Sequence, residues 1–126
     1  MAHSVHTTEA EYRRMAATGT SVVHCPDSNF QLMSGYFDAA FTDQMNVNVS
    51  LGTDVGASGN NRHNSLNLFI LLQLGLLSMS DQICMAERVS KCRAINANQT
   101  SSYVSFRQAY DWATMGGARG ELLFTF

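Results

Sequence analysis

The stretch Val47-Asn-Val-Ser-Leu-Gly-Thr-Asp54-Val-Gly56 is an apolar run that stops at a carboxylate with glycines close on both sides. A short run of Val and Leu is typical of a buried strand, and the glycines are typical of the turn that follows it. In parallel α/β folds, functional side chains lie at the carboxyl ends of strands, where the loops converge. Asp54 is therefore our first candidate for a functional residue, and the alternative is an aspartate that only caps a turn or helix.

The segments upstream of this strand alternate between helix and strand patterns. Thr8 to Glu11 has the spacing of a capping box, which predicts a helix that begins there and ends at a left-handed Gly19. A strand is predicted over residues 20–25, a polar loop over 27–35, and a weak helix over 37–45. Strands that alternate with helices in this way predict βαβ units and a parallel sheet.

The first residues of the chain, Ala2-His3-Ser4-Val5-His6, contain two histidines in a strand-like context. His3 lies where a strand should end, yet a strand usually needs about five residues. We therefore expect that the chain starts inside an element and that Met1 is an internal methionine of a longer protein. His6 lacks motif support and is expected to be a surface residue.

The second half of the chain has a less regular pattern. A polar loop is expected over residues 59–64, followed by an apolar run without a clear period over 66–77. Helical spacing resumes from Met85 to Cys92. A last helix is predicted after the capping residue Ser105, with Gly116-Gly117 as its terminator.

Composition and charge exclude several classes of protein. The net charge of −2 gives no electrostatic reason to expect binding to nucleic acid or to an anionic membrane. Cys25, Cys84 and Cys92 lack the spacing of a zinc finger, and reduced cytosolic thiols are the expected state. The apolar run is shorter than the roughly 20 residues that span a bilayer. No signal peptide pattern opens the chain, and a soluble cytoplasmic protein is expected.

Taken together, the three strand-like segments resemble the last three barrel strands of the amidohydrolase superfamily, and most closely its guanine deaminase branch. The shared pattern reads AH-x-V-H, then GT-x-V-x-HCP-x-SN, then SG and GTDVG. The resemblance covers residues 1–57 as strands and 85–119 as helices, whereas 58–84 diverge and 120–126 form an atypical tail.

The resemblance implies an α/β fold in which residues 1–126 form one partial domain. This domain would be the C-terminal part of a metal-dependent hydrolase with a TIM-type (β/α)8 barrel. About three strands would be present, ending at His3, Cys25 and Asp54. Three of eight strands cannot close a barrel, so open parallel edges would remain.

The same resemblance implies roles for individual residues. Asp54 would bind zinc and move a proton, and His3 would ligate the metal or hold its water. His24, Ser28 and Asn29 would line or support the pocket. His24 and Cys25 are adjacent in a predicted strand and point to opposite faces, which argues against a Cys/His nucleophile.

The function implied is hydrolysis of guanine to xanthine and ammonia by a zinc-dependent enzyme of purine catabolism. Catalytic zinc takes about three protein ligands, and this chain lacks the family's HxH pair, so we expect the chain alone to be inactive. A cytosine, S-adenosylhomocysteine or triazine aminohydrolase is the nearest alternative. A non-catalytic interaction protein, in which a partial barrel pairs its edges with another chain, also remains open, as does a homo-oligomer. A flavodoxin-like domain is disfavoured because no glycine-rich phosphate loop follows a strand.

Overall fold

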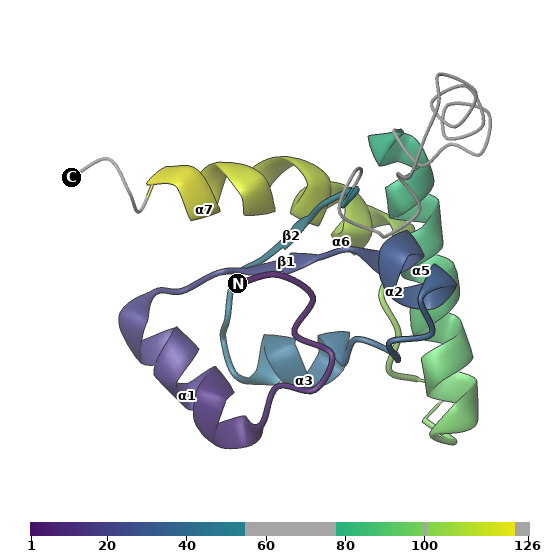
Figure 1. Ribbon diagram of the computed structural model, residues 1–126, viewed down its shortest axis with the longest axis horizontal. Helices are drawn as coiled ribbons and strands as arrows, with labels where there is room; N and C mark the ends of the chain where they lie inside the picture. Colours follow the sequence, from purple (N-terminus) through teal and green to yellow (C-terminus); the bar gives the residue numbers. More distant parts are fainter. Residues whose placement is uncertain (55–77, 100, 123–126) are drawn as a thin grey trace.

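The structure is a computed structural model that describes residues 1–54, 78–99 and 101–122. Figure 1 shows a short central sheet with helices around it. In chain order the elements are α1 (Glu9–Thr18), β1 (Val22–His24), α2 (Pro26–Gln31), α3 (Ala39–Gln44), β2 (Val49–Leu51), α5 (Met79–Asn96), α6 (Phe106–Asp111), the π-helical η1 (Trp112–Gly116) and α7 (Gly117–Leu122).

The sheet is parallel, as the sequence predicts. β1 pairs with β2 in a register that places Val22 opposite Val49 and His24 opposite Leu51. The opening segment lies beside β1 through an isolated parallel bridge between Ala2 and Val23, which extends the two-stranded sheet by one short segment. The His3 amide donates to the carbonyl of Val23 at 2.9 Å. The order is therefore opening segment, β1, β2, and the three segments run in the same direction.

The helix α1 confirms the predicted capping box. The Glu11 amide donates to Thr8 Oγ1 at 3.4 Å, and the Thr8 amide donates to the Glu11 carboxylate at 2.7 Å. Gly19 ends the helix with a left-handed φ of 66°. These contacts satisfy backbone groups that a helix end would otherwise leave without partners.

The predicted polar loop over residues 27–35 is wrong in its first half, because α2 occupies Pro26–Gln31. Proline fits the first turn of a helix, since its φ is preset and the missing N–H would have no intrahelical partner there. The Asn29 amide donates to the carbonyl of Cys25, which closes the first turn. Pro26 therefore begins a helix as well as ending the strand.

The prediction that Gly116-Gly117 ends the last helix is also wrong. The chain stays helical from Phe106 through η1 to Leu122. A Cβ placed on Gly116 would lie 2.0 Å from the carbonyl oxygen of Val49. Gly116 is therefore needed for close packing of η1 against β2, and it does not serve as a C-cap.

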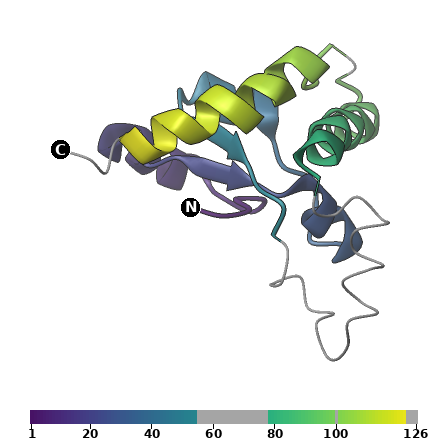
Figure 2. The same cartoon turned by 90° about the horizontal axis from the view of Figure 1, so that it is seen from above.

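The core lies between the sheet and the helices that pack on it. η1 and α7 pack on β2, and Figure 2 shows the helical segment from α6 to α7 crossing the strands. The buried apolar cluster joins both strands to α1, α3, α5 and α6: Tyr12, Met15, Val22, Phe37, Ala39, Val47, Val49, Leu51, Ile83, Ala86, Val104 and Ala109. A single core therefore fixes the strand ends relative to one another.

Two further observations complete the fold. Within residues 1–54, 78–99 and 101–122, no helix has the length and apolar character needed to cross a membrane. The predicted polar loop at 59–64 and the apolar run at 66–77 lie outside the described residues.

Candidate functional site

The carboxyl ends of the three parallel strands bring four of the five predicted site residues together. His3 follows the opening strand, Ser28 and Asn29 lie on α2 after β1, and Asp54 follows β2. The register of the sheet places these strand ends side by side. Asp54 lies three residues after the end of β2, and the residues that follow it lie outside the described part of the chain.

The backbone at this edge of the sheet adopts an unusual conformation. His3, Ser4 and Asp54 have φ values of 64°, 52° and 54°. The left-handed region disfavours residues other than glycine, and such conformations cost roughly 1–3 kcal/mol each. Backbone strain of this kind concentrates at functional sites, where the surrounding structure holds it in place.

Asn29 orients the imidazole of His3. His3 Nδ1 lies 2.9 Å from Asn29 Oδ1. The amide oxygen of asparagine only accepts hydrogen bonds, so Nδ1 of His3 carries the proton. In the neutral ring, Nε2 is then left with a free lone pair that can accept a proton or bind a cation.

The carboxylate of Asp54 lies at the centre of these residues and accepts a hydrogen bond. Ser28 Oγ donates to Asp54 Oδ2 at 2.7 Å, and His3 Nε2 lies 3.7 Å from the same oxygen. The side chain of Asp54 is 16% exposed and that of His3 is 42% exposed. The carboxylate is thus held by one buried hydroxyl while the imidazole remains open to solvent.

A pocket of about 510 Å³ opens beside these groups. Volumes of this order are typical of small-molecule sites. Besides His3, Asn29 and Asp54, it is lined by residues that the sequence did not single out for a site: Met1, Ser4, Val5, His6, Thr7, Glu11, Leu32 and Ser34. His6 is exposed, as predicted, but it also faces this pocket. These residues lie on the turn after the opening strand and near the ends of α1 and α2, so only the folded arrangement reveals them.

His24 lies apart from the group. Its ring stacks on Phe37 with a centroid distance of 4.5 Å and meets Trp112 edge-on at 6.5 Å. Burial, together with the smaller effect of the nearby His3, lowers the pKa of His24 to about 3. A neutral histidine packed between aromatic rings has a structural role, so the predicted pocket role of His24 finds no supporting contact.

Cys25 points to the other face of β1 from His24. A Cβ on Gly52 would meet both Cys25 Sγ and Val23 Cγ1, which shows that these two side chains share one face. Burial raises the pKa of Cys25 to about 11, and the charge of Asp54 acts in the same direction. Cys25 is therefore a thiol at neutral pH, which agrees with the expectation that it is not a nucleophile.

Zinc is the cofactor that the family resemblance implies. Asp54 and His3 supply a carboxylate and an imidazole that meet at 3.7 Å. Catalytic zinc takes about three protein ligands, and no group of three His, Cys, Asp or Glu occurs among the residues that the structure describes. These residues alone do not fit a resident zinc. What they offer is an acid/base pair at the rim of a pocket.

The parallel sheet with helices around it, and the polar residues that follow its strands, define an α/β protein. The amidohydrolase family profile matches residues 1–120. The chain therefore belongs to the amidohydrolase family.

Several relatives carry the names of deaminases. A 5-methylthioadenosine/S-adenosylhomocysteine deaminase of Halobacterium salinarum is 36% identical over 118 residues, which cover 94% of this chain and 23% of the relative. A guanine deaminase of Escherichia coli is 45% identical over 56 residues, which cover 44% of this chain and 13% of that protein. The chain thus spans about a quarter or less of the length of these relatives.

Solved structures of guanine deaminases have the same fold. The enzyme of C. acetobutylicum, determined with guanine in its active site, aligns with a TM-score of 0.75 and 26% identity over 95% of this chain and 25% of its own length. The E. coli enzyme aligns with a TM-score of 0.72 and 30% identity over 97% of this chain and 23% of its own. Both support a TIM-barrel-type domain, of which the described residues form a part.

Proposed function

We propose that this chain carries the strand-end part of the active site of a hydrolytic deaminase, and that the substrate is guanine. The observation that carries this proposal is the convergence of Ser28 and His3 on one oxygen of Asp54 at the rim of the pocket. A deaminase needs an acid/base group that takes a proton from water and delivers it to an amine. Asp54, backed by a hydroxyl and beside an imidazole, is suited to that role.

The proposed reaction replaces the exocyclic amine of guanine by oxygen. Water adds to the ring carbon that bears the amine, and Asp54 takes the proton that the water releases. The carboxylic acid so formed then protonates the amine, the carbon–nitrogen bond breaks, and ammonia and xanthine leave. One water is consumed for each ammonia released, and Asp54 ends in its starting state.

The neighbours of Asp54 have separate tasks in this proposal. Ser28 fixes one carboxylate oxygen by donating to it, which leaves the other oxygen for proton transfer. His3, oriented through its Nδ1 by Asn29, presents Nε2 to the same region. It is placed to hold the attacking water.

A second candidate substrate is a thioadenosine nucleoside. The relatives with matches over 118 residues include 5-methylthioadenosine/S-adenosylhomocysteine deaminases. Such substrates carry an exocyclic amine on a purine ring, so the same proton transfers would apply. The two candidates differ in the sugar and sulfur groups, which other parts of a pocket would have to accommodate.

The first test uses the purified 126-residue chain. Zinc content and xanthine formation from guanine would be measured together, with 5-methylthioadenosine as the second substrate. We expect less than one zinc per chain and no turnover, since the described residues supply two donors and not three. Stoichiometric zinc with turnover would show that the chain, or an assembly of it, forms a complete site.

A second experiment tests whether the group formed by His3, Ser28, Asn29 and Asp54 supports catalysis when the rest of a barrel is present. Residues 1–54 would replace the matching segment of the E. coli guanine deaminase, and xanthine formation would be compared with that of the same chimera carrying Asp54→Asn. The active chimera should lose roughly 10²–10⁴-fold in kcat on this change, the usual contribution of a general acid/base. A folded chimera whose rate is unaffected by Asp54→Asn would contradict the proposal.

A further inference from the structure

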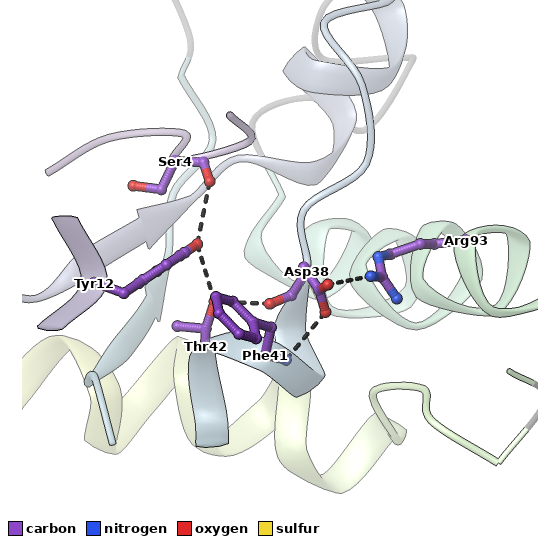
Figure 3. Close-up of polar contacts among 6 residues, drawn as sticks. All are labelled: Ser4, Tyr12, Asp38, Phe41, Thr42 and Arg93. Atoms are coloured by element: carbon purple, nitrogen blue, oxygen red, sulfur yellow. Dashed lines mark hydrogen bonds and ion pairs between the residues drawn. The ribbon is translucent and has the colours of Figure 1, made fainter. Parts of the chain in front are cut away.

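A buried polar chain connects the helix layer to the turn that carries His3. Figure 3 shows the hydroxyl of Tyr12 between the backbone of Ser4 and the side chain of Thr42. Tyr12 is 2% exposed and Thr42 is fully buried. Buried polar groups need partners, and these two residues find them in each other and in the backbone of the Ser4 turn.

The direction of the hydrogen bonds follows from the available protons. The carbonyl oxygen of Ser4 can only accept, so the single hydroxyl proton of Tyr12 is donated to it, across 3.2 Å. Thr42 Oγ1 also has a single proton, which it can donate to the Tyr12 oxygen at 3.1 Å or to the carbonyl oxygen of Asp38 at 2.7 Å. When Thr42 donates to Tyr12, the hydrogen bonds run without interruption from Thr42 to the Ser4 carbonyl. Burial raises the pKa of Tyr12, so its hydroxyl keeps this proton at neutral pH.

The acceptor of this bond lies in a strained turn. His3 and Ser4 both have left-handed φ values, and the Ser4 amide donates to the carbonyl of Ala2 at 2.8 Å, two residues back. Turns closed over three residues with a positive central φ are rare and strained. A conformation of this kind persists only where neighbouring groups hold it. Tyr12 supplies such a contact directly after His3.

The far end of the polar chain is anchored on two helices. Asp38 caps α3 by accepting from the Phe41 amide at 3.0 Å. The guanidinium of Arg93, on α5, pairs with the same carboxylate (Figure 3). Thr42 is one turn further along α3, so its hydroxyl has a fixed position from which to meet Tyr12.

We propose that Tyr12 is a positioning residue, whose hydroxyl, backed by Thr42, holds the left-handed His3–Ser4 turn and thereby sets the place of the His3 imidazole beside Asp54. That the His3 imidazole takes part in catalysis rests on the proposed function. The position of the imidazole ring does not rest on it, because this position can be measured without turnover. Tyr12 lies on α1 and outside the group of site residues, and it acts on that group through the backbone.

The test uses the 126-residue chain with Tyr12→Phe, which removes the hydroxyl and keeps the ring in the core. NMR at one fixed pH would compare the His3 imidazole resonances, the NOE contacts between His3 and its neighbours at the site, and amide exchange at Ser4. The Ser4 amide should exchange roughly tenfold faster relative to Val22 in β1, as expected for the loss of an ordinary hydrogen bond. The His3 resonances should shift.

Two further variants separate positioning from general destabilisation. Tyr110→Phe removes a hydroxyl from an exposed tyrosine on α6 and should leave the Ser4 amide and the His3 ring unchanged. Thr42→Val keeps the Tyr12 hydroxyl but removes its partner, and should move both readouts in the same direction as Tyr12→Phe by a smaller amount. If the Tyr12→Phe chain does not fold, Thr42→Val alone tests the inference.

The possible outcomes either support the inference or overturn it. Selective acceleration at Ser4 with displaced His3 resonances supports it. Equal acceleration at Ser4 and Val22, or an unchanged His3 ring in a folded Tyr12→Phe chain, would show that Tyr12 only contributes to the core. Because neither readout depends on catalysis, a chain without deaminase activity leaves this test valid.

Discussion

At the scale of single residues, the site depends on side chains that serve one another across elements. Asp54 is fixed by Ser28 and His3 is oriented by Asn29, so neither candidate catalytic group is held by its own strand alone. His24, in contrast, is buried by aromatic rings on the helix side and is kept neutral. Residues of one motif therefore have separate roles, because His24 ends β1 whereas Ser28 and Asn29 lie on α2.

The neutral His24 predicts acid sensitivity of the fold. Its pKa is lowered to about 3 in the folded chain from 6.5, so between these values the unfolded chain binds more protons. Stability is therefore complete above pH 6.5 and falls as the pH drops from 6.5 toward 3. Urea unfolding midpoints measured from pH 7 to 4 should decrease, and His24→Phe should reduce that slope. An unchanged slope in the folded variant would contradict the buried neutral state.

The three thiols should differ in reactivity. Cys25 is buried, with its pKa raised to about 11, whereas Cys84 is partly exposed and Cys92 is exposed. Only thiolate reacts with disulfide reagents, so Cys92 should react first and Cys25 last. Time-resolved labelling with mass spectrometry would give the order, with the unfolded chain as the control in which all three react. Labelling of Cys25 as fast as Cys92 would be inconsistent with its burial.

At the scale of elements, several local signals in the sequence were sufficient to predict where a helix begins and ends. Thr8, Glu11 and Gly19 predicted both ends of α1, because capping and left-handed glycine are local chemistry. α2 was missed because Pro26 was interpreted only as the end of a strand. The role of Gly116 was also missed, since its reason lies in a contact with Val49, distant in sequence.

Substitution by alanine should have opposite effects on stability at the adjacent glycines Gly116 and Gly117. Gly116→Ala would place a Cβ 2.0 Å from the Val49 carbonyl oxygen, and it should destabilise the fold by about 1–3 kcal/mol, as overpacking does. Gly117→Ala is the matched control, because a Cβ there meets nothing within 4 Å and the backbone is helical. It should be neutral or stabilising by up to about 1 kcal/mol.

Chemical denaturation of both glycine variants would check this pair. The free energies of unfolding should differ between Gly116→Ala and Gly117→Ala by more than the error of the method. Equal stabilities would mean that η1 does not approach β2 as closely as described.

At the scale of the whole molecule, the sequence predicted the parallel sheet, of which the structure describes two strands and one further bridged segment. It could predict this much because the alternation of elements and the strand-end position of polar residues follow general rules of α/β folds. The pocket lining and the link from Tyr12 to Thr42 could not be predicted, since they join residues 30 positions apart through packing. The alternative of a non-catalytic interaction protein also concerns the whole molecule, because it depends on the surface that the chain exposes to a partner.

An exposed apolar surface next to the site predicts self-association. Phe30, Leu32 and Met33 are 50%, 53% and 89% exposed, and a hollow of about 190 Å³ lies beside Phe30 and Met33. Clusters of exposed apolar side chains favour association in water. Sedimentation velocity over a concentration series should show reversible association, which the double change Leu32→Gln and Met33→Gln should weaken.

The matched control for association is Ile95→Gln, a polar change at an exposed apolar residue on α5, outside the 30–33 segment. This variant should associate as the parent chain does. A parent chain that stays monomeric at all concentrations would exclude the 30–33 surface as a contact between copies.

The spacing of the site contacts has a consequence for how the site is assembled during synthesis. His3 meets Asn29 across 26 positions, and Ser28 meets Asp54 across the same number. Each contact therefore spans one strand-helix unit. A nascent chain that ends after α2 already contains both residues of the His3–Asn29 contact, and the carboxylate is added one unit later. The core that fixes these strand ends relative to one another is complete only when α5 and α6 have followed.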